Sequence, residues 1–467
     1  MSLTQEQQAI ITHIKEAKED QVLLIDAVAG AGKTFLLTQI VSQVPHKRGI
    51  YLAYNKSVAV EAAGKFPSSI SCSTAHSLAY KAVVKSLGLR VGTFSYKDIK
   101  DRIPYEEKLD ILDNIKEFCL SSHTDIEDFA KERALSAGVL SLCTKYLNLM
   151  YDGKIECSHD FYMKVFHMHL ADGSVQYPKQ DFVLVDEAGD LSEVTLEIFK
   201  LLPAKVKIAV GDSAQNIYSF NHTINAFELL KDSGTPFRLT QSFRVSDEIA
   251  ARIEKFCIKH IDPEMSFKGQ PLVDKTIKTR ALLSRTNSEL ISAMIELQLA
   301  DTTFKLVRSA ADIFKVPLML CFVKYQGTIH DSSYKHIQAD IDEWYETPKL
   351  KETFKHPLQY VLSLYEFDIA LASAVRLLQS KGKSAILSVY EYAKACEKKQ
   401  SNLYLATSHS VKGLEFDEVT ILEDLNESTR KVLEPEDDKE VSEEDRIQEL
   451  NLYYVACSRA KKSLLNA

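Results

Sequence analysis

The chain has 467 residues, of which 45% are hydrophobic and 26% are charged. This composition is ordinary for a soluble globular protein, and at roughly 150 residues per domain it suggests about three structural units. No apolar run approaches the ~20 residues that a membrane-spanning helix needs, and the first residues, "MSLTQEQQAI", do not resemble a signal peptide. We therefore expect a soluble, intracellular protein that does not bind a membrane.

The net charge of −8 argues at first against a nucleic-acid-binding protein. However, residues Glu423 to Asp445 contain 11 acidic and 3 basic residues, and the rest of the chain carries 54 of each sign. The acidity lies in one segment, "EPEDDKEVSEED", which we expect to be a solvated surface loop, so a basic groove can exist elsewhere. The eight cysteines form no C-x-x-C pair and are expected to be reduced, mostly buried thiols.

In the first half of the chain, apolar runs alternate with amphipathic stretches. "QVLLIDAV" predicts a buried strand, and "TFLLTQIVSQV" predicts the helix that follows it. "GIYLAY", "SISCST", "DFVLVDE" and "KVKIAVGD" predict further buried strands, a pattern typical of a parallel sheet with helices on both faces. Residues 88–178 are polar and helical in pattern, as in "YEEKLDILDNIKEFCL", and are predicted to be an insertion in the first sheet domain, 1–87 and 179–237.

A second set of strands is predicted at "TRALLSRT", "TFKLVRS", "NLYLATSH" and "EFDEVTIL". These indicate a second α/β domain over 238–307 and 383–467. A mostly helical, aromatic-rich insertion, 308–382, contains the single tryptophan, Trp344. The expected fold class is α/β, with two parallel-sheet domains that each carry one insertion.

A phosphate-binding loop is predicted at "AVAGAGKT", between the first strand and its helix. The small residues from Ala29 to Gly32 let backbone N–H groups approach a phosphate, and the start of the helix adds partial positive charge. Lys33 would reach the β- and γ-phosphates, and the Thr34 hydroxyl would bind Mg²⁺. Ala27 replaces the first glycine of the usual loop pattern.

An acidic motif, "VLVDEAGDLSE", ends another predicted strand. Asp186 is placed to hold Mg²⁺, and Glu187 to orient and deprotonate the attacking water. The phosphate loop and this motif together predict an ATP hydrolase that uses Mg²⁺.

Six further segments resemble, in order, motifs of superfamily 1 helicases of the UvrD/Rep/PcrA type, and among these most closely the F-box DNA helicase branch, without an F-box. They are "LTQEQ", "AYNKSVAVEAAGKFP" with "STAHSLAY", "VGDSAQNIYSF", "LTQSFR", "TSHSVKGLEFDEV" and "LYYVACSRAKKSL". The resemblance implies two RecA-like P-loop domains, each with a helical insertion.

The resemblance also implies roles for single residues. Gln7 would read adenine, Phe243 would stack on it, and Glu415 would bind the ribose, beside the loop residues Ala29, Gly30, Ala31, Gly32, Lys33 and Thr34. Gln215 would contact the γ-phosphate, and Arg244 and Arg459 would be the two arginine fingers. Tyr218 and Phe220 would stack on bases, and the other candidates for nucleic-acid contact are Asn55, Lys56, Thr74, His76, His409 and Lys412. The alternative for these polar residues is that they cap helices or bond at the surface.

The function that follows is an ATP-dependent DNA helicase or translocase of replication, recombination or repair. It would move 3′→5′ on single-stranded DNA and unwind tailed duplexes as a monomer, with recombination or replication proteins as candidate partners. Two alternatives stay open: an ATP-driven translocase that strips proteins from single strands, and a nucleotide-switched nucleic-acid-binding module. RNA is not excluded as the nucleic acid. Gly189 stands where the family has a glutamine, and we hypothesise that it loosens the coupling between ATP state and DNA grip; a neutral role is the alternative.

Overall fold

The computed structural model describes residues 3–17, 19–43, 47–217, 223–323, 335–365, 368–435 and 441–467. The chain divides into two compact units, Met1–Phe243 and Arg244–Ala467. Each unit contains one parallel sheet, of six strands in unit 1 and five in unit 2, which confirms the predicted α/β class with two sheet domains. Among the described residues, no helix has the length and apolar character needed to span a membrane.

The sheet of unit 1 has the strand order β3-β2-β4-β6-β1-β8, and each neighbouring pair is parallel. The central strands are continuous apolar runs because helices cover both faces of such a sheet. Leu23, Val183 and Ile208, on three adjacent strands, are all completely buried. The strands are β1 (Gln21–Ala27), β2 (Gly49–Leu52), β3 (Ile70–Ser73), β4 (Gln180–Val185), β6 (Ala204–Gly211) and β8 (Gly234–Leu239), and β5 (Leu191–Ser192) and β7 (Thr223–Ile224) form a separate antiparallel pair.

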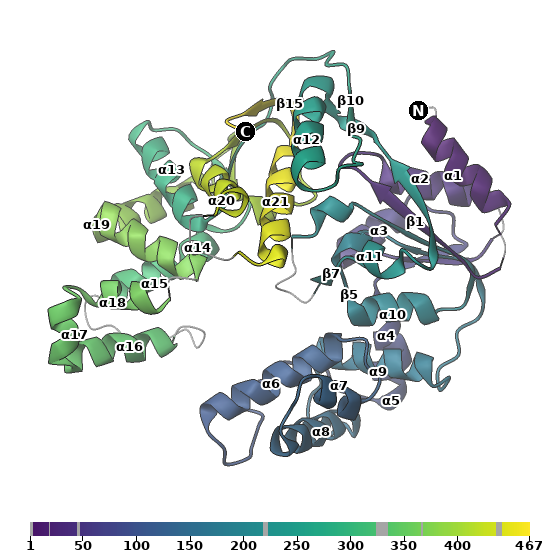
Figure 1. Ribbon diagram of the computed structural model, residues 1–467, viewed down its shortest axis with the longest axis horizontal. Helices are drawn as coiled ribbons and strands as arrows, with labels where there is room; N and C mark the ends of the chain where they lie inside the picture. The colour runs from purple at the N-terminus through teal and green to yellow at the C-terminus, as the bar shows by residue number, and fades with distance from the viewer. Residues whose placement is uncertain are drawn as a thin grey trace. The chain divides into compact units, whose positions relative to one another are not determined.

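The insertion of unit 1 is helical, as its sequence predicted. Its helices lie together beside α10 (Figure 1) and share one continuous apolar core with it, through side chains such as Ile111, Phe166 and Phe199. The insertion helices are α6 (Tyr105–Leu120), α7 (Ile126–Glu132), α8 (Ala137–Tyr151) and α9 (His159–Ala171). The other helices of unit 1 are α1 (Gln5–Lys15), α2 (Lys33–Ser42), α3 (Lys56–Ala63), α4 (Ala75–Ala79), a π-helical turn (Tyr80–Val84), α5 (Lys85–Leu87), α10 (Glu193–Leu201) and α11 (Ala226–Leu230).

The sheet of unit 2 has the order β12-β13-β11-β14-β15, again with parallel neighbours. Its strands are β11 (Arg280–Ser284), β12 (Lys305–Leu306), β13 (Leu403–Thr407), β14 (Phe416–Ile421) and β15 (Ala460–Leu465), and β9 (Gln241–Ser246) pairs separately with β10 (Lys268–Gln270). The helices around the sheet are α12 (Asp247–His260), α13 (Asn287–Leu299), α20 (Glu423–Leu433) and α21 (Glu443–Cys457).

The second insertion is also helical. It contains α14 (Ala310–Ile313), α15 (Lys315–Val323), α16 (Lys335–Glu346), α17 (Pro348–Thr353), α18 (Pro357–Leu364) and the first part of α19 (Ile369–Cys396). Gly382, where the insertion was predicted to end, interrupts α19 with a φ of 78°. Glycine adopts this left-handed conformation without a steric penalty, so the residue marks a kink in the helix. All eight cysteines are free and seven are buried, as predicted.

Candidate nucleotide site and nucleic-acid residues

The predicted nucleotide-binding residues of unit 1 meet at one edge of its sheet. The phosphate loop follows β1, Asp186 and Glu187 follow β4, and the segment that contains Gln215 follows β6. These three strands are neighbours in the order β4-β6-β1. Ligands of open parallel sheets bind outside the carboxyl ends of the strands, and these residues lie at those ends.

The phosphate loop has the backbone that its glycines predicted. Gly30 and Gly32 both have a φ of 77°, and α2 begins directly after Gly32, at Lys33. The carbonyls of Ala29 and Gly30 accept hydrogen bonds from Ser242 Oγ (2.7 Å) and from the Phe243 N–H (2.9 Å). Because C=O and N–H point in opposite directions across a trans peptide, the N–H of Gly30 faces away from Ser242, as an anion cradle requires.

The structure brings Gln7 and Phe243 to the same loop. Thr4 and Gln7 form a reciprocal cap at the start of α1, and the Gln7 amide donates to the Ala31 carbonyl at 3.4 Å. A Cβ placed on Gly32 would lie 3.7 Å from Gln7 Nε2 and 3.8 Å from the Phe243 ring. The glutamine and the aromatic ring that the resemblance assigns to adenine therefore flank the phosphate loop.

The acidic motif meets the phosphate loop through an ion pair. Lys33 Nζ lies 2.9 Å from Glu187 Oε2. Asp186 accepts from the Tyr51 hydroxyl and from the Glu187 N–H, both at 2.9 Å. Glu187 has a φ of 53°, a left-handed conformation that costs a non-glycine residue about 1–2 kcal/mol and that occurs preferentially at functional sites. This backbone directs the Glu187 carboxylate toward the loop lysine.

Charges in this cluster shift one another's pKa values. Burial lowers the pKa of Lys33, but the carboxylates of Glu187, Asp186 and Asp212 outweigh burial and raise it above its usual value, so the ammonium stays charged. Burial, with a smaller contribution from Glu187, raises the pKa of Asp186. The site thus has more carboxylates than cations and lacks positive charge, which a bound divalent cation would supply. The Asp186 carboxylate and the Thr34 hydroxyl are oxygen donors, which Mg²⁺ prefers.

The segment after β6 is fixed by hydrogen bonds within itself and by hydrogen bonds to β1. The Gln215 amide donates to Asp212 Oδ2 at 2.6 Å, and the side chain is 5% exposed. Ser213 donates to Asp26 through its N–H (3.0 Å) and its hydroxyl (2.8 Å). Gln215 is therefore held at the edge where the phosphate loop lies. Tyr218 and Phe220, predicted to stack on bases, lie outside the described residues.

Gly189 lies where the acidic motif packs against the segment after β6. It is buried in a 3₁₀ turn, Ala188–Asp190, and a Cβ at this position would lie 2.9 Å from the Asp212 carbonyl oxygen. Gly211 makes the reciprocal approach, because its Cβ would lie 2.8 Å from the Ala188 nitrogen. Two glycines thus let the backbones of the two motifs touch, which gives Gly189 a structural reason that its sequence context did not reveal.

The nucleic-acid candidates of unit 1 lie at the same sheet edge. Asn55 and Lys56 come after β2, and Thr74 and His76 come after β3. Asn55, Lys56 and His76 are exposed. Asn55 caps α3 by accepting from the Val58 N–H at 2.9 Å, and Thr74 caps α4 by accepting from the Ser77 N–H at 3.1 Å. These two side chains have the capping role left open as an alternative, and their contact with nucleic acid stays a prediction.

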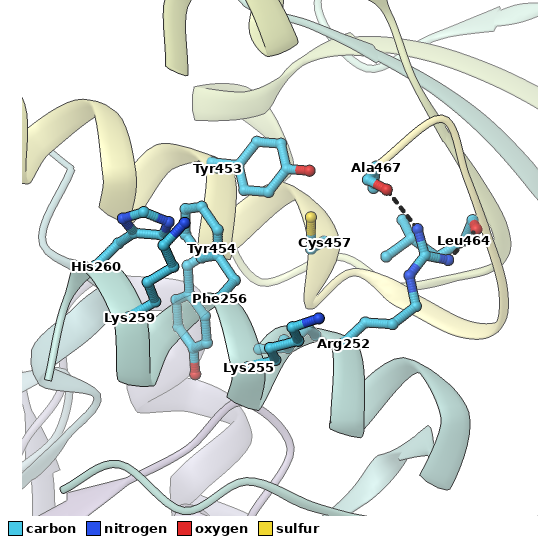
Figure 2. Close-up of a pocket in the computed structure, with 11 residues that line it drawn as sticks. Arg252, Lys255, Phe256, Lys259, His260, Tyr453, Tyr454, Cys457, Leu464 and Ala467 are labelled. Carbon is cyan, nitrogen blue, oxygen red and sulfur yellow. Dashed lines mark hydrogen bonds between the residues drawn. The ribbon is translucent and has the colours of Figure 1, made fainter. Parts of the chain in front are cut away.

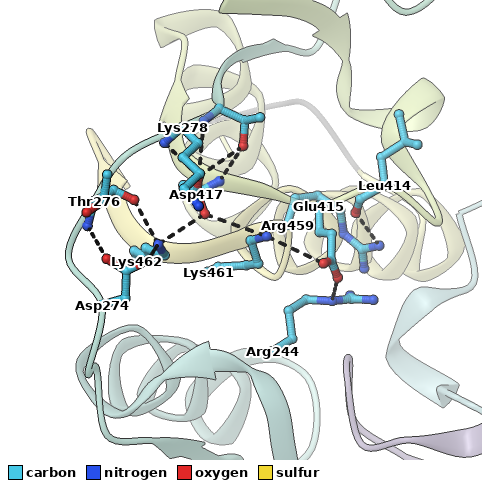
Figure 3. Close-up of polar contacts among 11 residues, drawn as sticks. Arg244, Asp274, Thr276, Lys278, Leu414, Glu415, Asp417, Arg459, Lys461 and Lys462 are labelled. Atoms are coloured by element: carbon cyan, nitrogen blue, oxygen red, sulfur yellow. Dashed lines mark hydrogen bonds and ion pairs between the residues drawn. The ribbon is translucent and has the colours of Figure 1, made fainter. Parts of the chain in front are cut away.

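The predicted arginine finger Arg244 is paired with the predicted ribose-binding residue, both in unit 2. Arg244 Nε lies 2.8 Å from Glu415 Oε2, and Lys461 Nζ lies 3.6 Å from Glu415 Oε1 (Figure 3). Lys461 and Lys462 also approach Asp417, at 3.6 and 3.5 Å. Two cationic side chains thus surround Glu415.

Arg459, the second predicted finger, is 1% exposed. Its Nε donates to the Val455 carbonyl at 2.9 Å. Its Nη1 donates to the Leu414 carbonyl at 3.4 Å, as Figure 3 shows. The Phe416 N–H donates to the Arg459 carbonyl at 2.9 Å. Arg459 and Glu415 therefore lie together at the amino ends of β15 and β14.

The two nucleic-acid candidates of unit 2, His409 and Lys412, follow β13 at its carboxyl end. Burial and then the nearby Arg285 guanidinium lower the pKa of His409 to about 4. Its imidazole is therefore neutral at pH 7, so it can accept or donate a hydrogen bond without attracting a phosphate by charge.

Sequence reasoning missed Tyr51, Asp212 and Tyr54. Tyr51 is completely buried and needs a partner for its hydroxyl, so a tyrosine inside an apolar strand was the available signal. Asp212 directly follows a buried strand, as Asp186 does. Tyr54 is 53% exposed beside Asn55, and burial, followed by the Asp190 and Glu187 carboxylates, raises its pKa. Tyr54 is thus next to the candidate Asn55 in the chain and within the electrostatic influence of the acidic motif.

Comparison with known proteins agrees with this geometry. A family model described as an AAA domain matches residues 7–221. The chain is 25% identical to the F-box DNA helicase protein 1 of Schizosaccharomyces pombe, with 99% of this chain and 57% of that protein covered. It is 24% identical to the F-box DNA helicase 1 of Gallus gallus, with 100% of this chain and 49% of that protein covered. The chain spans about half the length of these relatives.

The predicted resemblance is thereby confirmed. The match to the AAA domain covers the phosphate loop, the acidic motif and Gln215, and the two helicases align with both units. The chain therefore carries an AAA domain at residues 7–221, and along its whole length it is distantly similar to the F-box DNA helicases.

Proposed function

We propose that the chain is an ATP-dependent DNA helicase that moves 3′→5′ on single-stranded DNA and unwinds duplex during replication, recombination or repair. One observation carries the proposal: the Lys33–Glu187 ion pair beside Asp186 lies at the same sheet edge as the exposed residues after β2 and β3. Two relatives named as DNA helicases support DNA as the substrate. The polarity rests on the superfamily resemblance.

The hydrolysis step follows from the ion pair. The γ-phosphate of ATP would take Glu187's place beside Lys33, because both are anions that compete for one ammonium. The released Glu187 carboxylate would orient a water molecule and accept its proton as the water oxygen bonds to the γ-phosphorus and the bond to the β-phosphate oxygen breaks. Bound Mg²⁺, held by Thr34 and Asp186, would supply the positive charge that the carboxylate cluster lacks.

Unit 2 would supply further groups to the nucleotide. Arg244 would exchange Glu415 for a phosphate oxygen, and Glu415 would then be available for the ribose hydroxyls. Arg459 would leave the backbone carbonyls of Val455 and Leu414 in the same way. Negative charge that develops on the transferred phosphoryl group would draw both arginines in.

The decisive experiment measures ATP hydrolysis with and without single-stranded DNA, followed by unwinding of 3′-tailed and 5′-tailed duplexes. We expect DNA to stimulate hydrolysis, and we expect the 3′-tailed duplex to be unwound and the 5′-tailed duplex to stay intact. Stimulated hydrolysis with release of a bound protein but without unwinding would instead indicate a stripping translocase. Hydrolysis that DNA does not stimulate would indicate a nucleotide-switched binding module. Stronger stimulation by RNA than by DNA would indicate that RNA is the substrate.

A further inference from the structure

A cavity of about 350 Å³ opens between α12, α21 and β15 of unit 2. Apolar side chains line most of it, including Phe256, Tyr453 and Leu464. Figure 2 shows Lys259 and His260 at one end and Arg252 at the other, with Lys255 between them. The volume lies within the range of ligand pockets, roughly 300–1,000 Å³, and is large enough for one bulky side chain.

The ionisable side chains with nitrogen groups around this cavity are all basic residues. Arg252, Lys255, Lys259 and His260 line it, and no aspartate or glutamate does. Within the part of the chain that the structure describes, Lys255 and Lys259 form no ion pair, whereas the Arg252 guanidinium is held by the carbonyls of Leu464 (2.8 Å) and Ala467 (2.5 Å). A chain with a net charge of −8 thus carries a local cationic surface around an apolar pocket.

The cavity is separate from the predicted nucleic-acid residue His409 of unit 2. It adjoins β15, the edge strand, whereas His409 follows β13, three strands away. Strand spacing of about 4.8 Å puts roughly 14 Å between these two strands. One wall, with Tyr453 and Cys457, is the last turn of α21, the helix that leads directly to Arg459. An occupant would therefore contact the helix that carries a predicted finger.

We propose that this cavity, which we name the α12–α21 pocket, is a docking site for an acidic peptide segment of a partner protein. An apolar or aromatic side chain of the peptide would enter the pocket, and its flanking carboxylates would pair with Lys255 and Lys259. Charge complementarity favours an acidic partner, because its carboxylates would meet Lys255 and Lys259, which line the pocket and form no ion pair among the described residues.

A single-stranded nucleic acid fits the pocket less well, although it also carries negative charge. Bases bind to aromatic rings with free faces. Phe256 already packs against Tyr453 and His260, with ring centroids 4.7 and 5.2 Å apart. These rings therefore form an apolar wall against which a side chain can pack, and they do not offer free faces on which a base could stack.

The test uses the full chain without ATP or DNA, so it does not depend on the proposed helicase activity. The probe is a fluorescein-labelled synthetic decapeptide rich in aspartate and glutamate with a central phenylalanine, and binding is measured by fluorescence anisotropy. The variant is Lys255→Glu with Lys259→Glu. The matched control is Lys398→Glu with Lys399→Glu, two exposed lysines after α19 in the same unit. Circular dichroism verifies that both variants are folded.

We expect the pocket variant to bind the peptide about tenfold or more weakly, because two attractive contacts become repulsive, and the control variant to bind as the unmodified chain does. Replacing the central phenylalanine by glycine, or all the acids by their amides, should weaken binding by a similar factor. Three results would overturn the proposal: no peptide binding by the unmodified chain, equal losses in both variants, or displacement of the peptide by a single-stranded oligonucleotide whose own binding the pocket variant abolishes.

Discussion

The two sheets of the molecule use their edges differently. In unit 1, the phosphate loop, the acidic motif and the nucleic-acid candidates all follow carboxyl ends of strands. In unit 2, Glu415 and Arg459 precede β14 and β15, whereas His409 and Lys412 follow β13. A six-residue strand is about 20 Å long. Unit 1 therefore groups its predicted nucleotide and nucleic-acid residues at one edge of its sheet, whereas unit 2 has them at both ends of its strands, joined by the short segment that leads from His409 through Lys412 to Glu415.

The two units have opposite arrangements of charge around the groups that are predicted to bind the nucleotide. Unit 1 surrounds one ammonium, Lys33, with carboxylates, and unit 2 surrounds one carboxylate, Glu415, with Arg244 and Lys461. In each unit, a group predicted to bind the nucleotide already has a protein partner of opposite charge. If ATP binds as proposed, it would have to replace these partners, so the proposed contacts with the nucleotide would form only when it is bound.

The largest expected effect is that of Lys33→Ala, which removes the ammonium that pairs with Glu187 in the carboxylate cluster. ATP turnover should fall at least about 100-fold, the usual loss when a group that stabilises the transition state is removed. Lys47→Ala is the matched control, because Lys47 pairs with Asp181 at 3.0 Å at the opposite end of β4. A steady-state phosphate-release assay measures both. Equal turnover in the two variants would show that Lys33 does not act on the nucleotide.

Glu187→Gln tests the other half of the same ion pair. The amide cannot accept the proton of water, so hydrolysis should fall about 100-fold while ATP still binds. A fluorescent ATP analogue reports binding and phosphate release reports turnover. Glu197→Gln, which affects a surface pair with Lys200 at 2.8 Å, is the control. Loss of nucleotide binding together with turnover would assign Glu187 a structural role.

In unit 2, Arg244→Ala can be compared with Arg280→Ala. Both arginines pair with a glutamate in the same unit, Arg244 with Glu415 at 2.8 Å and Arg280 with Glu418 at 3.1 Å. Only Arg244 is a predicted finger, so its loss should lower the maximal rate of ATP hydrolysis by about 10- to 1,000-fold. The Arg280 variant should behave as the unmodified chain, because exposed ion pairs contribute little. Similar rates in both would leave the finger role of Arg244 unsupported.

The sequence predicted the fold class and the helical insertions because buried strands, glycine-rich turns and amphipathic helices leave local patterns. It also placed Lys33 and Glu187 in one site, since both follow parallel strands. It could not predict that Tyr51 donates to Asp186 or that Arg459 is buried, because these contacts depend on which strands become neighbours and on side-chain orientation. Gly189 was the clearest case: its sequence context suggested a missing amide, and only the packing revealed the Asp212 carbonyl 2.9 Å from its would-be Cβ.

The smallest expected effect is that of substitutions at Gly189, which distinguish these two explanations for the glycine. If close packing requires glycine, Gly189→Ala and Gly189→Gln should both lower the free energy of unfolding, by about 1–3 kcal/mol, because the Asp212 backbone cannot move as a side chain can. Gly64→Ala is the control, since its Cβ would meet only the Glu61 carbonyl, at 3.4 Å. Thermal unfolding measures stability, and DNA stimulation of ATP hydrolysis measures coupling. If the missing amide loosens coupling, glutamine alone should increase the stimulation. Equal stimulation in the alanine and glutamine variants, with equal loss of stability, would make backbone packing the reason for glycine at this position.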